Sequence, residues 1–170
     1  MNVNLNRRRF LKRTAGVAIG GIALPYIIPA RVLGADGGVA PSNRITMAGI
    51  GVGMQGSWNV KQFMQESDCR VIAVCDIDMT NLLEGIHMVN DHYGNKDCTG
   101  YEDYREVLAR GDIDTVVISV PDHWHAIIGI AAAKAGKDIY CEKPLSHDLK
   151  QGSAMCEAVK RYGTVWQTGN

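Results

Sequence analysis

The sequence is poor in aromatic residues and in proline, and it carries no net charge. Aromatic residues make up 6% of the 170 positions, there are five prolines, and 18 basic residues balance 18 acidic ones. The hydrophobic content of 46% excludes a disordered chain, because such chains bury too little apolar surface. The 19 glycines follow no short period, which excludes a collagen-like chain. The length alone favours one folded domain.

The five cysteines are an odd number and show no C-x-x-C spacing. The sequence therefore contains no zinc-binding pattern, and we predict no metal site. Cys75 and Cys141 lie in apolar segments, where a thiol acts as a small buried hydrophobic group. One disulfide stays open as an alternative, although no spacing requires it.

Acidic residues are missing from the first 31 positions, which hold six of the 18 basic residues. These are Arg7, Arg8, Arg9, Lys12, Arg13 and Arg31. Beyond Ala35, 12 basic and 18 acidic residues remain, a net charge of −6. An acidic body excludes a nucleic-acid protein that binds by neutralising phosphates.

An uncharged run of 17 residues, 14–30, follows the basic start. A membrane-spanning helix needs roughly 20 apolar residues, and glycines and prolines interrupt this shorter run. A basic start, a short apolar run and small residues at the end are typical of an export signal. Arg7 and Arg8, followed by Arg9-Phe10-Leu11-Lys12, resemble a twin-arginine signal.

We therefore predict an export signal in residues 1–35 and a linker in residues 36–43. The twin-arginine translocase would be a partner, and the protein would be periplasmic or secreted, without a stable membrane span. An uncleaved signal that tethers the protein to the membrane is the alternative.

Residues 44–170 alternate short apolar segments with longer amphipathic ones. The apolar segments predict strands at 44–50, 70–75, 114–120, 138–141 and 164–168. The amphipathic segments predict helices at 54–66, 79–93, 101–110, 123–135 and 149–162, with a polar loop at 94–100. Asp148 would cap the last helix. This alternation is typical of a Rossmann-type doubly wound α/β fold, in which a parallel sheet is buried on both faces.

The glycine cluster Gly51-Val52-Gly53-Met54-Gln55-Gly56 matches the G-x-G-x-x-G pattern of dinucleotide sites. It follows a predicted strand and opens a predicted helix, which is the context that this pattern needs. Gly51 would permit the tight turn, Gly53 would let the backbone approach the pyrophosphate, and Gly56 would let helix and strand pack closely. The start of the helix, with Met54 and Gln55, would offer its N–H groups to the phosphates.

Asp76 ends the second predicted strand, 25 residues after Gly51. Its carboxylate would accept hydrogen bonds from the adenosine ribose and repel the 2′-phosphate of NADP. Ile77 offers no charge that could hold this phosphate, so we predict NAD rather than NADP. Asp78 is an alternative for part of this role. A purely structural glycine turn followed by a strand-end aspartate is the other interpretation.

Two further polar segments lie at predicted strand ends, where ligands gather in an open parallel sheet. In the segment 121–126, Asp122 either caps the next helix or contacts a cofactor. His123 and His125 point to different sides of that helix, so at least one is expected at the helix start or in the core. In the segment 142–144, a lysine ammonium group could orient a substrate oxygen or take part in proton transfer.

Together these motifs, in this order and at these distances, resemble the glucose-fructose oxidoreductase, inositol dehydrogenase and MocA family. The resemblance implies that Pro121, Asp122 and His125 line the nicotinamide ribose and that Glu142 helps to position the cofactor. It further implies that Lys143 contacts the cofactor and is the catalytic lysine near the reacting carbon. The Lys143–Pro144 bond would be cis, which costs little before proline.

Members of this family continue with a second α/β domain that binds the sugar and usually mediates oligomerisation. We expect the chain to be the nucleotide-binding part of such a protein. The resemblance implies an exported NAD-dependent oxidoreductase acting on a sugar or polyol hydroxyl. Two alternatives stay open: an NAD-dependent glycoside hydrolase that uses transient oxidation and elimination, and a non-catalytic dinucleotide-binding module.

Overall fold

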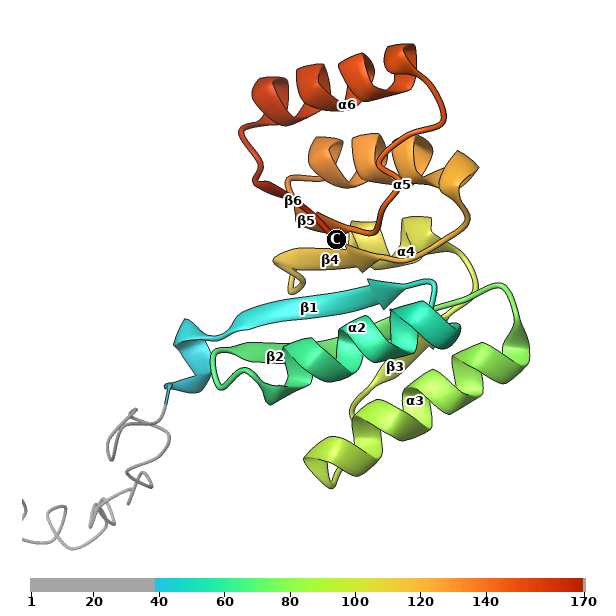
Figure 1. Cartoon of the computed structure of the whole chain (residues 1–170). Helices are drawn as coiled ribbons and strands as arrows, with labels where there is room; N and C mark the ends of the chain where they lie inside the picture. The colour runs from blue at the N-terminus through green and yellow to red at the C-terminus, as the bar shows by residue number, and fades with distance from the viewer. Residues whose placement is uncertain (1–38, 170) are drawn as a thin grey trace, which may run out of the picture.

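Six strands form one parallel sheet in the computed structural model, which describes residues 39–169 (Figure 1). The strands are β1 (Ile45–Ile50), β2 (Cys69–Cys75), β3 (Thr99–Tyr101), β4 (Thr115–Ile118), β5 (Asp138–Cys141) and β6 (Trp166–Thr168). Their order across the sheet is β3-β2-β1-β4-β5-β6, and every neighbouring pair is parallel. This confirms the predicted Rossmann-type doubly wound fold. The predicted signal and the first three residues of the predicted linker, 36–38, lie outside the described residues.

Helices cover both faces of the sheet (Figure 1). They are α2 (Met54–Gln65), α3 (Met79–Tyr93), α4 (Tyr104–Ala109), α5 (Asp122–Lys134) and α6 (Leu149–Tyr162). The helices α2 and α3 pack on one face, and α4, α5 and α6 on the other. A short 3₁₀ turn, Pro41–Asn43, precedes β1.

Successive strand residues enter two separate hydrophobic cores, because side chains alternate between the faces of a strand. Val74 and Val117 face α2 and α3, whereas Ala73 and Val116 face α4 and α5; all four are at most 1% exposed. This explains the continuous apolar segments in the sequence: a strand buried on both faces has no polar side.

The predicted loop at 94–100 and the predicted helix start at Tyr101 are wrong, because Thr99–Tyr101 is strand β3. Three residues with a central glycine carry no readable strand pattern, and β3 exists because it pairs with Ala73–Cys75 of β2. A Cβ on Gly100 would lie 2.5 Å from Ile86 Cδ1, so α3 can pack over this edge only because that side chain is missing. The following helix starts at Tyr104, where Asp103 accepts a hydrogen bond from the Arg105 amide.

The ends of the helices test further predictions made from the sequence. Asp148 caps α6, as predicted, by accepting from the Gln151 amide at 2.8 Å. Asp122 does not cap α5: Pro121 precedes that helix, no side chain caps it, and Asp122 is its first residue.

All five cysteines are free thiols, and Cys75 and Cys141 are buried as predicted. Burial raises the pKa of each of these two thiols to about 12. Within residues 39–169, no three His, Cys, Asp or Glu side chains are arranged to hold a metal ion. In the same part of the chain no helix is both long and apolar enough to cross a membrane.

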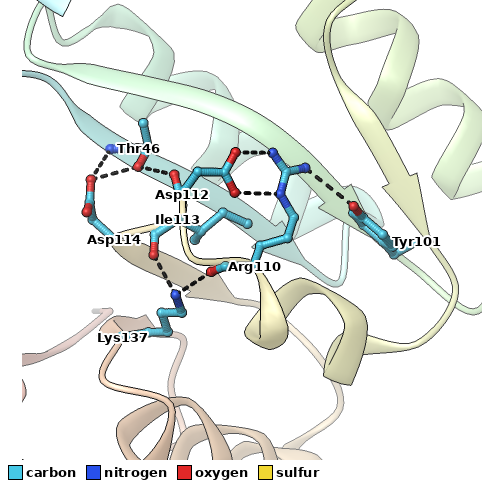
Figure 2. Close-up of polar contacts among 7 residues, drawn as sticks. All are labelled: Thr46, Tyr101, Arg110, Asp112, Ile113, Asp114 and Lys137. Atoms are coloured by element: carbon cyan, nitrogen blue, oxygen red, sulfur yellow. Dashed lines mark hydrogen bonds and ion pairs between the residues drawn. The ribbon is translucent and has the colours of Figure 1, made fainter. Parts of the chain in front are cut away.

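At the amino ends of the strands, polar side chains join the loop before β4 to strand β1 and to the turn before β5 (Figure 2). We call the group of Thr46, Arg110, Asp112, Asp114 and Lys137 the basal cluster. The buried Lys137 ammonium donates to the carbonyls of Arg110 and Ile113, at 2.6 and 2.7 Å. These bonds join the turn before β5 to the loop before β4. They also satisfy a buried charge that would otherwise be costly.

Asp114 holds the same loop against β1. One of its carboxylate oxygens accepts from the Thr46 amide at 2.8 Å, and the Thr46 hydroxyl lies 2.7 Å away. The Arg110 guanidinium binds Asp112 at 2.7 Å, and this raises the pKa of Arg110. The hydrogen bonds from Thr46 lower the pKa of Asp114 below its ordinary value of 3.8.

We expect Asp114→Asn to lower the free energy of unfolding at pH 7 by about 1 kcal/mol, a charged hydrogen bond discounted for its exposure. Because the folded-state pKa of Asp114 is depressed, its contribution is complete above about pH 4 and is lost as the pH falls through that pKa. Urea unfolding between pH 7 and pH 3 would measure the difference, with Glu102→Gln, an exposed acid outside the basal cluster, as control. A difference that does not shrink on acidification would contradict this role.

Candidate cofactor-binding site

The predicted site segments meet at one edge of the sheet. Gly51 follows β1, Asp76 follows β2, Pro121 lies just after β4, and Glu142 follows β5. Since all these strands are parallel, their carboxyl ends lie together. The strand order reverses between β1 and β4, which is where open α/β sheets bind ligands.

The glycine turn has the geometry that its sequence predicts. Gly51 has φ +80°, a left-handed conformation that favours glycine. A Cβ on Gly56 would collide with the Gly51 carbonyl, so only glycine lets α2 lie this close to the end of β1. Gly53 is different: the nearest atom to a Cβ there would be Asn81 Nδ2 at 3.6 Å. A methyl group on Gly53 would therefore meet only this one neighbour, at ordinary van der Waals distance.

The first turn of α2 has N–H groups without a side-chain cap. By contrast, Asp78 caps α3 by accepting from the Thr80 amide, and Asp148 caps α6. The Ser57 hydroxyl donates to the Val52 carbonyl at 2.6 Å and fixes the turn from within. Uncapped N–H groups at the positive end of a helix suit the phosphates of a dinucleotide.

Asp76 is held beside this turn by two backbone amides. One carboxylate oxygen accepts from the Val52 amide and the other from the Asp78 amide, both at 2.9 Å. Each oxygen keeps acceptor capacity for a further donor, so the side chain can hold a ribose hydroxyl without moving. Asp78 is committed to its cap on α3, which favours Asp76 over Asp78 for that role.

His125 connects the two later strand ends. Its ring nitrogens lie 2.7 Å from the Pro144 carbonyl and 2.8 Å from the Val120 carbonyl, and the side chain is 1% exposed. The interpretation of one histidine as a core residue is confirmed for His125. Its predicted contact with the cofactor stays a prediction. The Lys143–Pro144 bond is cis, and Lys143 is exposed beside it.

Glu142 is buried, at 6% exposure, in a group of side chains from three elements. One of its oxygens accepts from Asn59 Nδ2 at 2.9 Å and lies 3.4 Å from Gln55 Nε2. Its other oxygen accepts from the Lys143 amide at 3.2 Å. Asn59 Nδ2 also donates to the Ser119 hydroxyl at 2.9 Å. We call Gln55, Asn59, Ser119 and Glu142 the acidic network.

Sequence reasoning missed Asn59 and Ser119. A readable sign of Asn59 did exist: it lies with Gly56, Val60 and Met64 on the face of α2 that packs on the sheet, and it is 2% exposed. A polar side chain on the buried face of a helix needs a partner, and only the sheet could supply one. Ser119 gives no such sign, because it follows β4 at a position where any small residue would fit.

The Glu142 carboxylate affects the titration of Tyr140, which lies two residues earlier in β5. Tyr140, half-buried in β5, has a raised pKa, first through burial and then through the nearby Glu142 carboxylate. A Cβ on Gly169 would lie 2.8 Å from the Tyr140 hydroxyl and 2.9 Å from Glu142 Oε1. The end of β6 therefore closes over the acidic network.

Comparison with known proteins agrees with this geometry. Residues 45–170 match the glucose-fructose oxidoreductase, inositol dehydrogenase and MocA family, described as an oxidoreductase family with an NAD-binding Rossmann fold. The chain belongs to this family.

Its relatives include a glycosyl hydrolase family 109 protein of Shewanella pealeana, 37% identical over 85% of this chain and 34% of the relative. An alpha-N-acetylgalactosaminidase of Shewanella oneidensis is 31% identical over 93% of this chain and 38% of the relative. Among solved structures, myo-inositol 2-dehydrogenase from Lactobacillus plantarum superposes with a TM-score of 0.64 at 25% identity. That likeness covers 74% of this chain and 36% of the dehydrogenase. The chain thus spans about a third of the length of its relatives.

The two glycines of the turn should respond differently to an added methyl group. We expect Gly56→Ala to lower the free energy of unfolding by several kcal/mol, because its Cβ overlaps the Gly51 carbonyl. Gly53→Ala should change stability by less than about 1 kcal/mol, since its Cβ would make only an ordinary van der Waals contact, with Asn81. Thermal unfolding of both variants would measure the two changes in stability, and titration with a dinucleotide would measure whether each variant still binds the cofactor. Equal destabilisation by the two substitutions would refute the assignment.

Proposed function

We propose that this chain binds NAD and forms the nucleotide-binding part of an oxidoreductase that acts on a sugar or polyol hydroxyl. The observation that carries the proposal is Asp76, fixed by the Val52 amide beside an uncapped glycine turn. The family supports the class of reaction, and the myo-inositol 2-dehydrogenase relative supports a polyol as one kind of substrate.

Each part of the site has a task in this proposal. The amides of Gly53, Met54 and Gln55 would bind the pyrophosphate, and Asp76 would accept from the adenosine ribose. Pro121 and Asp122, at the start of α5, would border the nicotinamide half together with Glu142. NAD, when bound, supplies the acceptor for a hydride from the substrate carbon.

Lys143 would act on the substrate oxygen. Its side chain is exposed, while its backbone amide donates to Glu142 and the carbonyl of the next residue, Pro144, lies 2.7 Å from a His125 ring nitrogen. A lysine ammonium so placed can donate to a hydroxyl or carbonyl oxygen and can exchange a proton with it. His125 is then a positioning residue, since it reaches Lys143 only through the Pro144 carbonyl.

Asp76 also supports NAD over NADP. A 2′-phosphate would add negative charge where a carboxylate is already fixed, and the neighbouring Ile77 side chain is exposed and uncharged. Like charges this close repel, and neither ion pair found within residues 39–169 joins a cation to Asp76.

We expect Asp76→Asn to weaken NAD binding about tenfold and to narrow the ratio between the NADP and NAD dissociation constants. Calorimetric titration of the chain with both cofactors would measure this. Asp91→Asn, which removes an exposed acid from the last turns of α3, is the control: it should leave both constants within about twofold. Unchanged NAD affinity in Asp76→Asn would overturn the assignment of Asp76. No binding by the unsubstituted, folded chain would overturn the proposed function.

A second candidate is a glycoside hydrolase that oxidises the sugar transiently and restores NAD. The names of the Shewanella relatives favour it. The same residues would bind NAD, so the two candidates differ only in the fate of the substrate. In the complete enzyme, free sugar released from a glycoside without accumulation of NADH would identify the hydrolase. NADH accumulating in proportion to substrate would identify the dehydrogenase.

Export by the twin-arginine translocase is part of the same proposal. It rests on Arg7, Arg8 and the uncharged run 14–30, all outside the described residues. This route transports folded proteins, so a protein that must carry NAD out of the cytoplasm has a reason to use it.

A further inference from the structure

The two halves of the sheet end in the same way. Each half begins with a strand–helix–strand unit, β1-α2-β2 or β4-α5-β5, and an acid directly follows the second strand of each unit: Asp76 after β2 and Glu142 after β5. In a doubly wound sheet each half binds one mononucleotide of the cofactor. Asp76 belongs to the adenosine half, so Glu142 belongs to the nicotinamide half.

The two acids differ in their surroundings. Asp76 is partly exposed and accepts only backbone amides. Glu142 is 6% exposed, and the groups that donate to it, from Asn59, Gln55, Tyr140 and the Lys143 amide, are all neutral. In the described part of the chain, neither recorded ion pair involves Glu142. Its negative charge is therefore hydrogen-bonded but not neutralised.

A buried charge acts over a longer distance than an exposed one, because little water screens it. The oxidised nicotinamide ring carries a positive charge, and the reduced ring carries none. A fixed negative charge in the nicotinamide half therefore attracts the oxidised ring more strongly than the reduced ring. A negative charge in the adenosine half does not discriminate between NAD⁺ and NADH, because the adenosine is the same in both.

We propose that Glu142, held by Asn59, makes the site prefer the oxidised cofactor NAD⁺ over NADH. The acidic network is thus a specificity determinant for oxidation state. The inference rests on the proposed NAD binding. It adds that the bound cofactor is mainly in the oxidised form, and that bound NADH is a stronger hydride donor than free NADH. Asn59 is a positioning residue, since it reaches the cofactor's charge only through Glu142.

Calorimetric titration of the folded chain with NAD⁺ and with NADH tests this without any turnover. We expect Glu142→Gln, which keeps the shape and removes the charge, to lower the ratio of the NADH to the NAD⁺ dissociation constant about tenfold. For a two-electron couple, tenfold corresponds to a shift of about 30 mV in the potential of the bound cofactor. Asp76→Asn is the matched control: it should weaken both forms by the same factor and leave the ratio unchanged.

A second variant guards against a folding defect in Glu142→Gln. Gln55 is exposed and lies 3.4 Å from the Glu142 carboxylate, so Gln55→Lys places a cation there without disturbing the core. We expect it to lower the same ratio about threefold, even if the added charge strengthens binding of both forms through their phosphates. If Glu142→Gln folds and leaves the ratio of the NADH to the NAD⁺ dissociation constant unchanged, the inference is overturned. If Glu142→Gln does not fold, an unchanged ratio in Gln55→Lys overturns it. If the unsubstituted chain binds neither form, the proposed function fails and this inference fails with it.

Discussion

The contact between Gly56 and the Gly51 carbonyl is the constraint on which the site depends. It brings the start of α2 against the end of β1, closer than any side chain would allow. This contact directs the uncapped amides of α2 over the edge of the sheet and brings the Val52 amide within reach of Asp76. The phosphate-binding side of the site thus depends on glycine, because a side chain at Gly56 would prevent this close approach.

The same close approach sets what lies one turn further along α2. Asn59 follows Gly56 by three residues and therefore faces the sheet on the same side of the helix. There it meets the ends of β4 and β5, through Ser119 and Glu142. One helix thus connects the glycine turn to the segment that carries Lys143. A shift of α2 would therefore displace groups in both halves of the site.

Much of this arrangement could be predicted from the sequence, because the relevant information is local. The glycine pattern, the acid at the end of β2 and the alternating apolar segments each depend on neighbouring residues, and the structure has them where they were expected. What could not be predicted depends on distant partners. Strand β3 forms only because β2 offers it an edge, and Asn59 has a role only because Glu142, 83 residues later, ends beside it. Asp122 looked like a cap because its neighbours suit one, but Pro121 already occupies the position before the helix.

Stability and binding are divided between the two edges of the sheet. At the amino ends, the charged groups of the basal cluster have hydrogen-bond partners within the chain: Lys137 donates to backbone carbonyls, and Asp112 accepts from Arg110. At the carboxyl ends the polar groups are oriented but not all satisfied. The first amides of α2 have no side-chain cap, Asp76 keeps acceptor capacity, and neither ion pair within residues 39–169 gives Glu142 a cation. Leaving such groups without full partners costs stability, and a fold tolerates that cost where a ligand supplies the missing partners. A dinucleotide has phosphates for the amides, ribose hydroxyls for the acids and, when oxidised, a positive charge for Glu142.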